Sequence, residues 1–466
     1  MLAKNPVIYS DFPDPDVIRV GDTYYLVTTT MHFFPGAQIL ASKDLVNWQH
    51  LCYVYDTFGE TPAQRLEKGH IYGQGMWAPT LRLHDGVFHV VFSCNDTKCC
   101  YHFTATDIRG PWTPGKIEGF YHDASLLFDD DGKVYIVYGN RDIYITQLKA
   151  DLSAPLPGGL HRVLLHDEAE GLGWEGSHIY KMGGRYYLCN IHWPKGKMRI
   201  QAVHSSESLT GDFVGGEVLE DDLDGSFRGV AQGGIIDTPD GRYFMMLFQD
   251  HGAEGRMPVL VPFTWEEDKL KLSKVPLELD VPVDESLPKL YTSDALKGTL
   301  SPLWQWNHEP DWRHIAYTPE GLRLTCLGPA ADVESARNTL TQRCFGKRCV
   351  ATVTVDASAL QEGDYAGICA LQGCFGQLCV TVWQGQKYLS LRTREAGDGT
   401  LFRSTETPRE RALLPLEGET VTLRAAFDFS VDQVQFSYEK EGAFVDVGKP
   451  HALVYRLDHF TGCRIG

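Results

Sequence analysis

One pattern recurs five times in the N-terminal half of the chain and constrains the fold more than any other feature. Each copy is a Gly- or Asp-containing tight turn followed by a run of aromatic and β-branched residues, which is typical of a β-hairpin. The aligned positions are separated by 64, 46, 52 and 57 residues, intervals that suit four-stranded sheets with variable loops. These positions are Tyr24, Phe88, Val134, Tyr186 and Tyr243.

Helical periodicity is hard to find over the same region. We therefore predict an all-β fold in which residues 1–270 form a five-bladed β-propeller. A generic β-sandwich with accidental hairpin similarity is the alternative that the repeat alone leaves open.

The remainder of the chain has a different pattern. Pro276, Pro282 and Pro288 punctuate residues 271–290, which we expect to be an extended linker. Residues 291–466 carry short alternating segments such as 349–355 and 378–383, which predict a β-sandwich of jelly-roll type. This region has few clustered acids, so we expect no catalytic role for it.

Counting back ten or eleven residues from each aligned position identifies one residue in each predicted innermost strand. If the blades are equivalent, these residues point at the propeller axis. Three of the five are carboxylates, and an unpaired buried carboxylate costs several kcal/mol. The set therefore predicts chemistry at the axis: Asp14, Trp77, Asp123, Glu175 and Gln232.

Converging acids of this kind serve either a metal site or acid–base chemistry on a bond such as a glycosidic linkage. The aromatic surroundings favour a sugar, because Trp77, Phe33 and Trp193 are placed to stack on sugar faces near the strand ends. Glu175 follows Trp174, an apolar neighbour that would raise the pKa of a general acid.

Each acid also has a plainer interpretation. Asp14 lies between two prolines that fix its backbone, yet Asp11 or Asp16 in the same segment are alternatives for the acid that matters. Asp123 is also suited to capping a turn. Glu175 has the weakest such alternative, since its neighbours otherwise read as a buried strand.

The charge balance excludes several classes of partner. The 466 residues include 61 acidic and 43 basic ones, a formal net charge of −18. That charge repels nucleic acid and anionic membrane surfaces, and we expect neither as a partner. The N-terminal residues lack the apolar core of a signal peptide, and the 12 cysteines are scattered, so we expect a cytoplasmic protein with reduced thiols.

Four ordered motifs resemble those of glycoside hydrolase family 43. The resemblance covers about residues 5–265, and a C-terminal region like that of the β-xylosidase members covers most of the rest. It rests on Phe12-Pro13-Asp14-Pro15-Asp16, Met76-Trp77-Ala78-Pro79, His122-Asp123-Ala124-Ser125-Leu126 and Glu175-Gly176-Ser177-His178-Ile179-Tyr180.

The resemblance implies a five-bladed propeller that hydrolyses glycosides with inversion at the anomeric carbon. It makes Asp14 the general base that activates water and Glu175 the general acid on the leaving oxygen. Asp123 would tune the pKa of the acid and hold its orientation through its own negative charge. The resemblance further implies an exo-acting enzyme that releases terminal β-D-xylose, α-L-arabinofuranose or both from xylo- or arabino-oligosaccharides.

The same resemblance supplies binding residues. Arg256 and Gln232 would bind substrate, and Phe375 is our guess for a C-terminal loop residue at the active-site mouth. His251 would stand at the axis, where some relatives hold a structural calcium ion, although no cofactor is required for the chemistry. Ala231 stands where relatives often have His, which leaves the sugar preference open; a homo-oligomer is compatible with the sequence.

Two other functions fit the same fold. A retaining fructan-type furanosidase predicts Asn-Asp-Pro and Arg-Asp-Pro motifs, and neither occurs in the chain. A non-catalytic sugar-binding propeller predicts loss of at least one axial acid, but all three are present.

Overall fold

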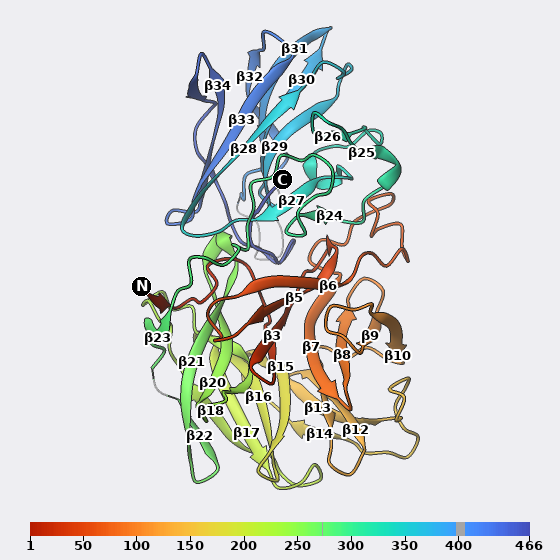
Figure 1. The fold of residues 1–466 in the computed structure, drawn as a ribbon, viewed down its shortest axis with the longest axis vertical. Helices are drawn as coiled ribbons and strands as arrows, with labels where there is room; N and C mark the ends of the chain where they lie inside the picture. The colour runs from red at the N-terminus through yellow and green to blue at the C-terminus, as the bar shows by residue number, and fades with distance from the viewer. Residues whose placement is uncertain (273, 398–405) are drawn as a thin grey trace.

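A computed structural model describes residues 1–272, 274–397 and 406–466. Two all-β units are stacked along its long axis, a propeller below and a sandwich above (Figure 1). The described residues include three short 3-10 segments, Gly252–Glu254, Trp312–His314 and Val333–Ser335, but no α-helix. None of these segments has the length to cross a membrane.

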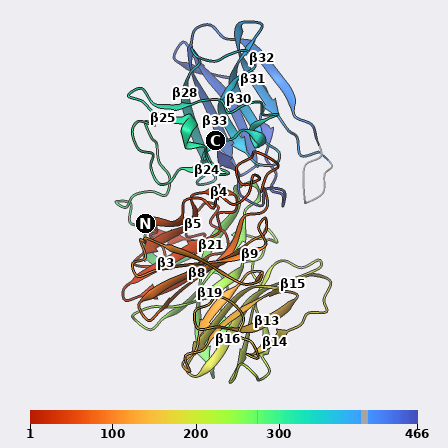
Figure 2. The same cartoon turned by 90° about the vertical axis from the view of Figure 1, so that its right-hand side faces the viewer.

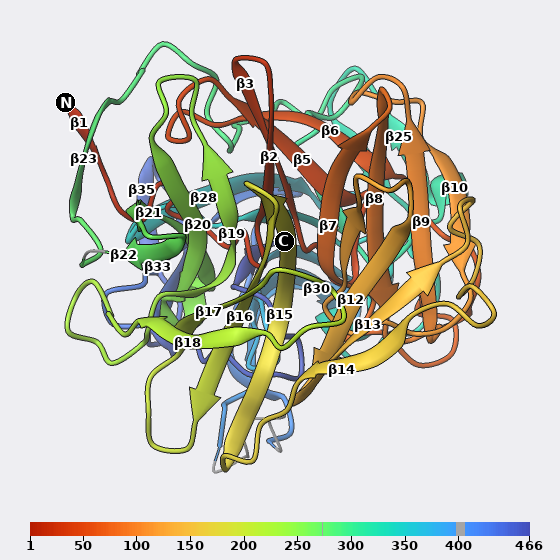
Figure 3. The same cartoon turned by 90° about the horizontal axis from the view of Figure 1, so that it is seen from below.

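The propeller has five four-stranded antiparallel sheets arranged around a centre (Figure 3), which confirms the predicted fold. Each blade begins with its innermost strand and proceeds outward. The first two blades are β2 (Asp16–Val20), β3 (Thr23–Thr28), β5 (Gly36–Ser42) and β6 (Gln49–Tyr55), then β7 (Met76–His84), β8 (Val87–Cys94), β9 (Cys99–Ala105) and β10 (Thr113–Ile117).

The other three blades repeat this order. They are β11 (Ser125–Phe128), β12 (Val134–Asn140), β13 (Asp142–Leu148) and β14 (His161–Leu165); β15 (Gly171–Met182), β16 (Arg185–Pro194), β17 (Ile200–Ser206) and β18 (Val214–Leu219); and β19 (Ala231–Asp237), β20 (Tyr243–Asp250), β21 (Arg256–Glu266) and β22 (Lys269–Leu272). The aligned aromatic and β-branched positions all fall at the start of the second strand of a blade, as the repeat predicted.

The ring closes by side-chain packing between the first and last blades, because no strand is exchanged between their sheets. Val17 and Leu26 of the first blade share an apolar cluster with Ile236 and Met246 of the last. Burial of such a cluster contributes about 25 cal/mol per Å² of apolar surface. The blades are therefore held together mainly by packing across their faces.

Over its described residues, the sandwich has an eight-stranded and a five-stranded sheet. Strand β4 (Phe33–Phe34) comes from the propeller and pairs with β24, so the larger sheet joins the two units. The larger sheet runs β32 (Arg409–Pro415), β31 (Gln386–Thr393), β30 (Gly376–Trp383), β29 (Tyr365–Leu371), β37 (Arg464–Ile465), β27 (Leu340–Arg343), β24 (Gln305–Asn307), β4; the smaller contains β28 (Arg348–Asp356), β33 (Thr420–Asp428), β34 (Gln433–Lys440), β35 (Ala443–Asp446) and β36 (His451–Ala452).

Four short strands form two pairs outside the blades and the two main sheets. In the predicted linker, β23 (Glu278–Pro282) pairs with β1 (Leu2–Lys4) along the side of the propeller. A small hairpin of β25 (Ile315–Tyr317) and β26 (Leu322–Leu324) lies beside the sandwich (Figure 2).

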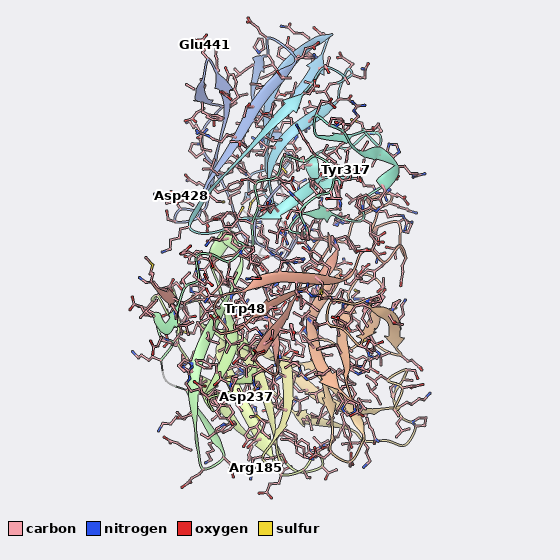
Figure 4. All side chains as sticks on the ribbon, viewed as in Figure 1. Trp48, Arg185, Asp237, Tyr317, Asp428 and Glu441 are labelled. Atoms are coloured by element: carbon pink, nitrogen blue, oxygen red, sulfur yellow. The ribbon has the colours of Figure 1, made fainter. Side chains whose placement is uncertain are left out.

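The orientation of the blades determines which end of the axis carries the site. Arg185, the first residue of β16, lies at the end of the propeller remote from the sandwich (Figure 4). Because β15 is antiparallel to β16, residues near the start of β15 lie toward the sandwich. Asp14 and Asp123 lie just before the innermost strands of their blades and Glu175 lies in the first half of β15, so the three predicted acids face the second unit.

Candidate active site

The predicted axial residues share a backbone distortion. Asp14, Asp123 and Gln232 have φ of 51°, 47° and 68°, and the residues after Trp77 and Glu175 also have positive φ. The strand register shifts at the same point of β7, β15 and β19. A bulge re-aims side chains, and left-handed backbone at non-glycine residues concentrates where function requires it. The distortion marks this level of the propeller as the site.

Gly176 shows how tightly the blades approach here. Its φ is 63°, and a Cβ on it would lie 2.6 Å from Cγ of Gln232. Both the conformation and the space therefore require glycine after the acid Glu175.

Asp14 is held by three donors from three parts of the propeller. Its Oδ1 accepts hydrogen bonds from Nη1 of Arg256 at 2.9 Å and Nε2 of Gln232 at 3.1 Å, and its Oδ2 accepts one from Oγ1 of Thr29 at 2.7 Å. Asp14 is 7% exposed. Hydrogen bonds to an ionised carboxylate stabilise its charge, so Asp14 is arranged as a fixed anion.

The two alternative acids near Asp14 have structural contacts. Asp16 is fully buried; it pairs with Arg82 at 2.7 Å and His178 at 3.1 Å, and these charges hold its pKa below the usual range although burial opposes them. Asp11 accepts backbone N–H groups of Arg256 and Gly462. Neither is left free for substrate, which favours Asp14.

The other two acids meet at one imidazole. Nε2 of His122 lies 3.5 Å from Oδ2 of Asp123 and 3.3 Å from Oε2 of Glu175. Oε2 of Glu175 also accepts a hydrogen bond from Nδ2 of Asn140 at 2.5 Å. Oδ2 of Asp123 accepts one from the backbone N–H of Gly176 at 3.2 Å. The side chains of Asp123, Glu175 and His122 are 8%, 15% and 23% exposed.

Burial and charge shape these titrations. Burial raises the pKa of Asp123, and the charges of Glu175 and Asp14 raise it further against the opposing His122. For His122, burial would lower the pKa, but the carboxylate of Asp123 and then that of Glu175 outweigh it and raise the pKa to about 9. The imidazole of His122 therefore keeps its proton at neutral pH.

Residues from both units surround these acids. The ring of Trp77 lies 5.8 Å from that of His122 and 5.6 Å from that of Phe460. The guanidinium of Arg256 lies 4.7 Å from the Phe460 ring, and Nε1 of Trp77 and Nε of Arg256 are buried without a protein partner. Phe460 belongs to the C-terminal segment, so the second unit contributes to the wall of the site.

Two aromatic predictions are wrong. Phe33 has no exposed surface; it lies in β4 beneath the guanidinium of Arg464, 4.0 Å away, where it joins the two units. Phe375 also has no exposed surface and packs under Arg394. A ring without accessible surface has no face left for a sugar, and Phe460 takes the position expected for Phe375.

Trp193 lines a hollow of about 230 Å³ at the seam between the last two blades and the sandwich. Its neighbours there include Arg199, Asp250 and Tyr455. Arg199 stacks on the Trp193 ring and pairs with Asp250 at 2.9 Å. This prediction therefore falls on an open surface next to the site.

The candidate ion ligand His251 lies just beyond β20, the second strand of its blade, with its ring 5.8 Å from that of Tyr9. Its nearby charges include Asp224 and Asp250, its pKa is lowered to about 4 by burial, and its Nε2 is buried without a protein partner. A neutral, unpartnered imidazole nitrogen fits a ligand atom. The structure does not bring His251 to the catalytic carboxyls.

Among the described residues, one group of His, Asp and Glu is compact enough to suggest a cation, with ligand atoms within 4.8 Å: His122, Asp123 and Glu175. These atoms already pair with one another and with Asn140. We assign the group to proton chemistry. Ala231 has no exposed surface and offers the site no polar group.

Several neighbours of the acids were not predicted. His122 stands next to Asp123 in the quoted motif, and that adjacency was the available signal. Asn140 ends β12 and Thr29 follows β3, positions that the blade repeat brings to the same level. Phe460 carries no such signal, because only the docking of the two units places it there.

Comparisons with known proteins agree with this geometry. The family model of glycosyl hydrolases family 43 matches residues 3–270, and that of the beta xylosidase C-terminal Concanavalin A-like domain matches residues 296–466. A putative beta-xylosidase of Xylanibacter ruminicola is 31% identical over 374 residues, covering 76% of this chain and 69% of that protein.

Two further relatives are informative. The non-reducing end alpha-L-arabinofuranosidase BoGH43B of Bacteroides ovatus is 28% identical over 283 residues, covering 57% of this chain and 52% of that protein. The solved bifunctional GH43-CE protein of Bacteroides eggerthii superposes with a TM-score of 0.93 at 38% identity over the whole of this chain, which spans 61% of that protein.

Proposed function

The chain belongs to glycoside hydrolase family 43, and from that premise we propose that it is an exo-acting, inverting hydrolase. It releases terminal β-D-xylose, α-L-arabinofuranose or both from short oligosaccharides. The names of its relatives support both sugars, since one is called a beta-xylosidase and another an arabinofuranosidase.

One observation carries the mechanism: the three acids converge but have opposite surroundings. Asp14 is fixed as an anion by Arg256, Gln232 and Thr29, which suits a base that activates water. Glu175 lies 3.3 Å from the imidazole of His122, a proton donor, which suits the acid that protonates the leaving oxygen. Asp123, whose charge faces the same imidazole, tunes that acid.

The wall that the second unit provides supports exo action. Phe460 packs against both Trp77 and Arg256, on the side of the site that faces the sandwich. A chain end fits against such a wall, whereas an internal segment of a polysaccharide needs a cleft open at both ends.

The test is to follow by proton NMR the anomer of the xylose first released from 4-nitrophenyl β-D-xyloside, and to measure turnover of xylobiose by Glu175→Gln alongside. Inversion predicts α-xylose as the initial product, and the variant should lose about 10²- to 10³-fold in kcat on xylobiose. With 4-nitrophenyl β-D-xyloside the loss should be smaller, because that leaving group needs little protonation. Initial release of β-xylose, or unchanged turnover of xylobiose by Glu175→Gln, would contradict the proposal.

We further propose that His251 is the protein ligand of a structural Ca²⁺ whose other ligands are water. The ion would brace the loop after β20 and takes no part in proton transfer. Chelation should lower Tm of the wild type and leave Tm of His251→Ala unchanged. An equal response of both proteins to chelator would remove this assignment.

A further inference from the structure

A third residue stands between the two acids on the leaving-group side. Nε2 of His122 faces Oδ2 of Asp123 at 3.5 Å and Oε2 of Glu175 at 3.3 Å. Both distances are within reach of a short proton transfer once substrate tightens the site. His122 is thus the sole described side chain that contacts both carboxyls through one atom.

The solvent exposure of the side chains decreases from His122 to Glu175 to Asp123. The His122 side chain is 23% exposed, that of Glu175 is 15% and that of Asp123 is 8%. A proton from solvent therefore reaches the imidazole of His122 more readily than the carboxyl of Glu175.

An inverting hydrolase has to restore its acid after each turnover. Glu175 gives one proton to the leaving oxygen, while Asp14 takes one from the attacking water. The two acids receive no proton from each other in this scheme, so Glu175 needs a separate donor. Here the inference rests on the proposed roles of Glu175 and Asp14.

We propose that His122 acts through Glu175, by returning this proton to its carboxyl. The Nε2–H bond of the imidazolium breaks and an O–H bond forms on the Glu175 carboxyl. The neutral imidazole then takes a proton from water, and the proton on Asp14 returns to solvent. No group is oxidised or reduced, and the charge lost by the imidazole is restored from solvent.

The charges around His122 favour its protonated form. Asp123 comes from its own turn, Glu175 from β15 and Asp14 from the segment before β2, and all three act on it as anions. Its other neighbour is the uncharged ring of Trp77. Their combined effect raises the pKa of His122 to about 9, so the donor stays charged through neutral pH.

Asn140 provides the matched control. Its Nδ2 donates to the same Oε2 of Glu175 at 2.5 Å, but an amide does not titrate. Loss of Asn140 therefore removes a positioning contact without removing a proton source. A purely structural role for His122 predicts the same behaviour for the two residues.

The experiment measures kcat and kcat/KM against pH with xylobiose for the wild type, His122→Gln and Asn140→Ala. His122→Gln should lower kcat about tenfold or more and move the basic limb of the kcat profile about one unit to lower pH, with KM little changed. Asn140→Ala should lower kcat and leave that limb in place or move it to higher pH, because its loss removes a donor to the Glu175 carboxylate. Added imidazole should restore the basic limb in His122→Ala, which also serves if the Gln variant folds poorly.

The opposite result is equally clear. Removing a cation beside Glu175 would raise the pKa of the acid if His122 acted only through its charge, and the basic limb would then move to higher pH. That shift, or an unmoved limb without imidazole rescue, overturns the proposal. Glu175→Gln is measured in parallel. If this variant retains full activity on xylobiose, the assigned acid is wrong. If it loses activity while the pH profile of the His122 variants stays unmoved, only the role of His122 is rejected.

Discussion

The base side and the acid side of the site occupy equivalent levels of different blades, yet they are built in opposite ways. Asp14 accepts hydrogen bonds from a guanidinium, an amide and a hydroxyl. Asp123 accepts one backbone N–H and faces a second carboxyl through a shared imidazole. The repeat thus supplies positions, while the donors around each position decide whether a carboxyl keeps or loses its proton.

The largest effect should come from removing the fixed anion. Asp14→Ala should lower kcat about 10³- to 10⁴-fold on both xylobiose and 4-nitrophenyl β-D-xyloside, because water activation is needed whatever the leaving group. Steady-state kinetics on the two substrates measure this. Asp22→Ala, at a side chain 83% exposed, is the control and should keep wild-type rates. A loss confined to xylobiose would show that Asp14 acts on the leaving group instead.

A neighbouring aspartate should affect stability. Asp16→Asn breaks a fully buried pairing with Arg82 and His178, and removing one partner of such a pair costs about 3–5 kcal/mol. Denaturant unfolding should show this loss, with activity per folded molecule nearly retained. Wild-type stability in Asp16→Asn would mean that these contacts do not support the first blade.

The contribution of the second unit is smaller. Phe460→Ala removes a ring packed on Trp77 and Arg256, so KM for xylobiose should rise about tenfold with a lesser change in kcat. Steady-state kinetics of Phe460→Leu, which keeps an apolar side chain but not the ring, separate the loss of packing from the loss of ring stacking. Unchanged KM in both variants would place the sugar away from this wall.

The smallest effect is a dependence of stability on pH. The pKa of His122 is raised in the fold, so its stabilising contribution is fully present below its ordinary value of 6.5 and is lost as pH rises through about 9. The wild type should therefore lose a few degrees of Tm over this window relative to His122→Gln. Thermal unfolding of both proteins between these pH values tests the sign of this change in Tm. Parallel curves of Tm against pH for the wild type and His122→Gln would contradict it.

The comparison also shows how far prediction from sequence reached. The five-bladed fold and the clustering of Asp14, Asp123 and Glu175 followed from turn spacing, because a propeller converts equal spacing into equal depth along its axis. Phe33 and Phe375 were misplaced, since an aromatic near a predicted strand end serves equally well in a core. His122 was visible in its motif but had no role until the partner carboxyl lay opposite it.

The sequence by itself determined the hairpins, the blade count and which residues lie in or just before each innermost strand. Those features depend on local turn chemistry and alternation, which a single chain segment encodes. Only the tertiary structure decided that Arg256 and Gln232 fix Asp14, that His122 lies between two acids, and that Phe460 contributes to the wall. Each of these contacts joins residues from different blades or units, and their pKa values and accessibility depend on distances that no local pattern specifies.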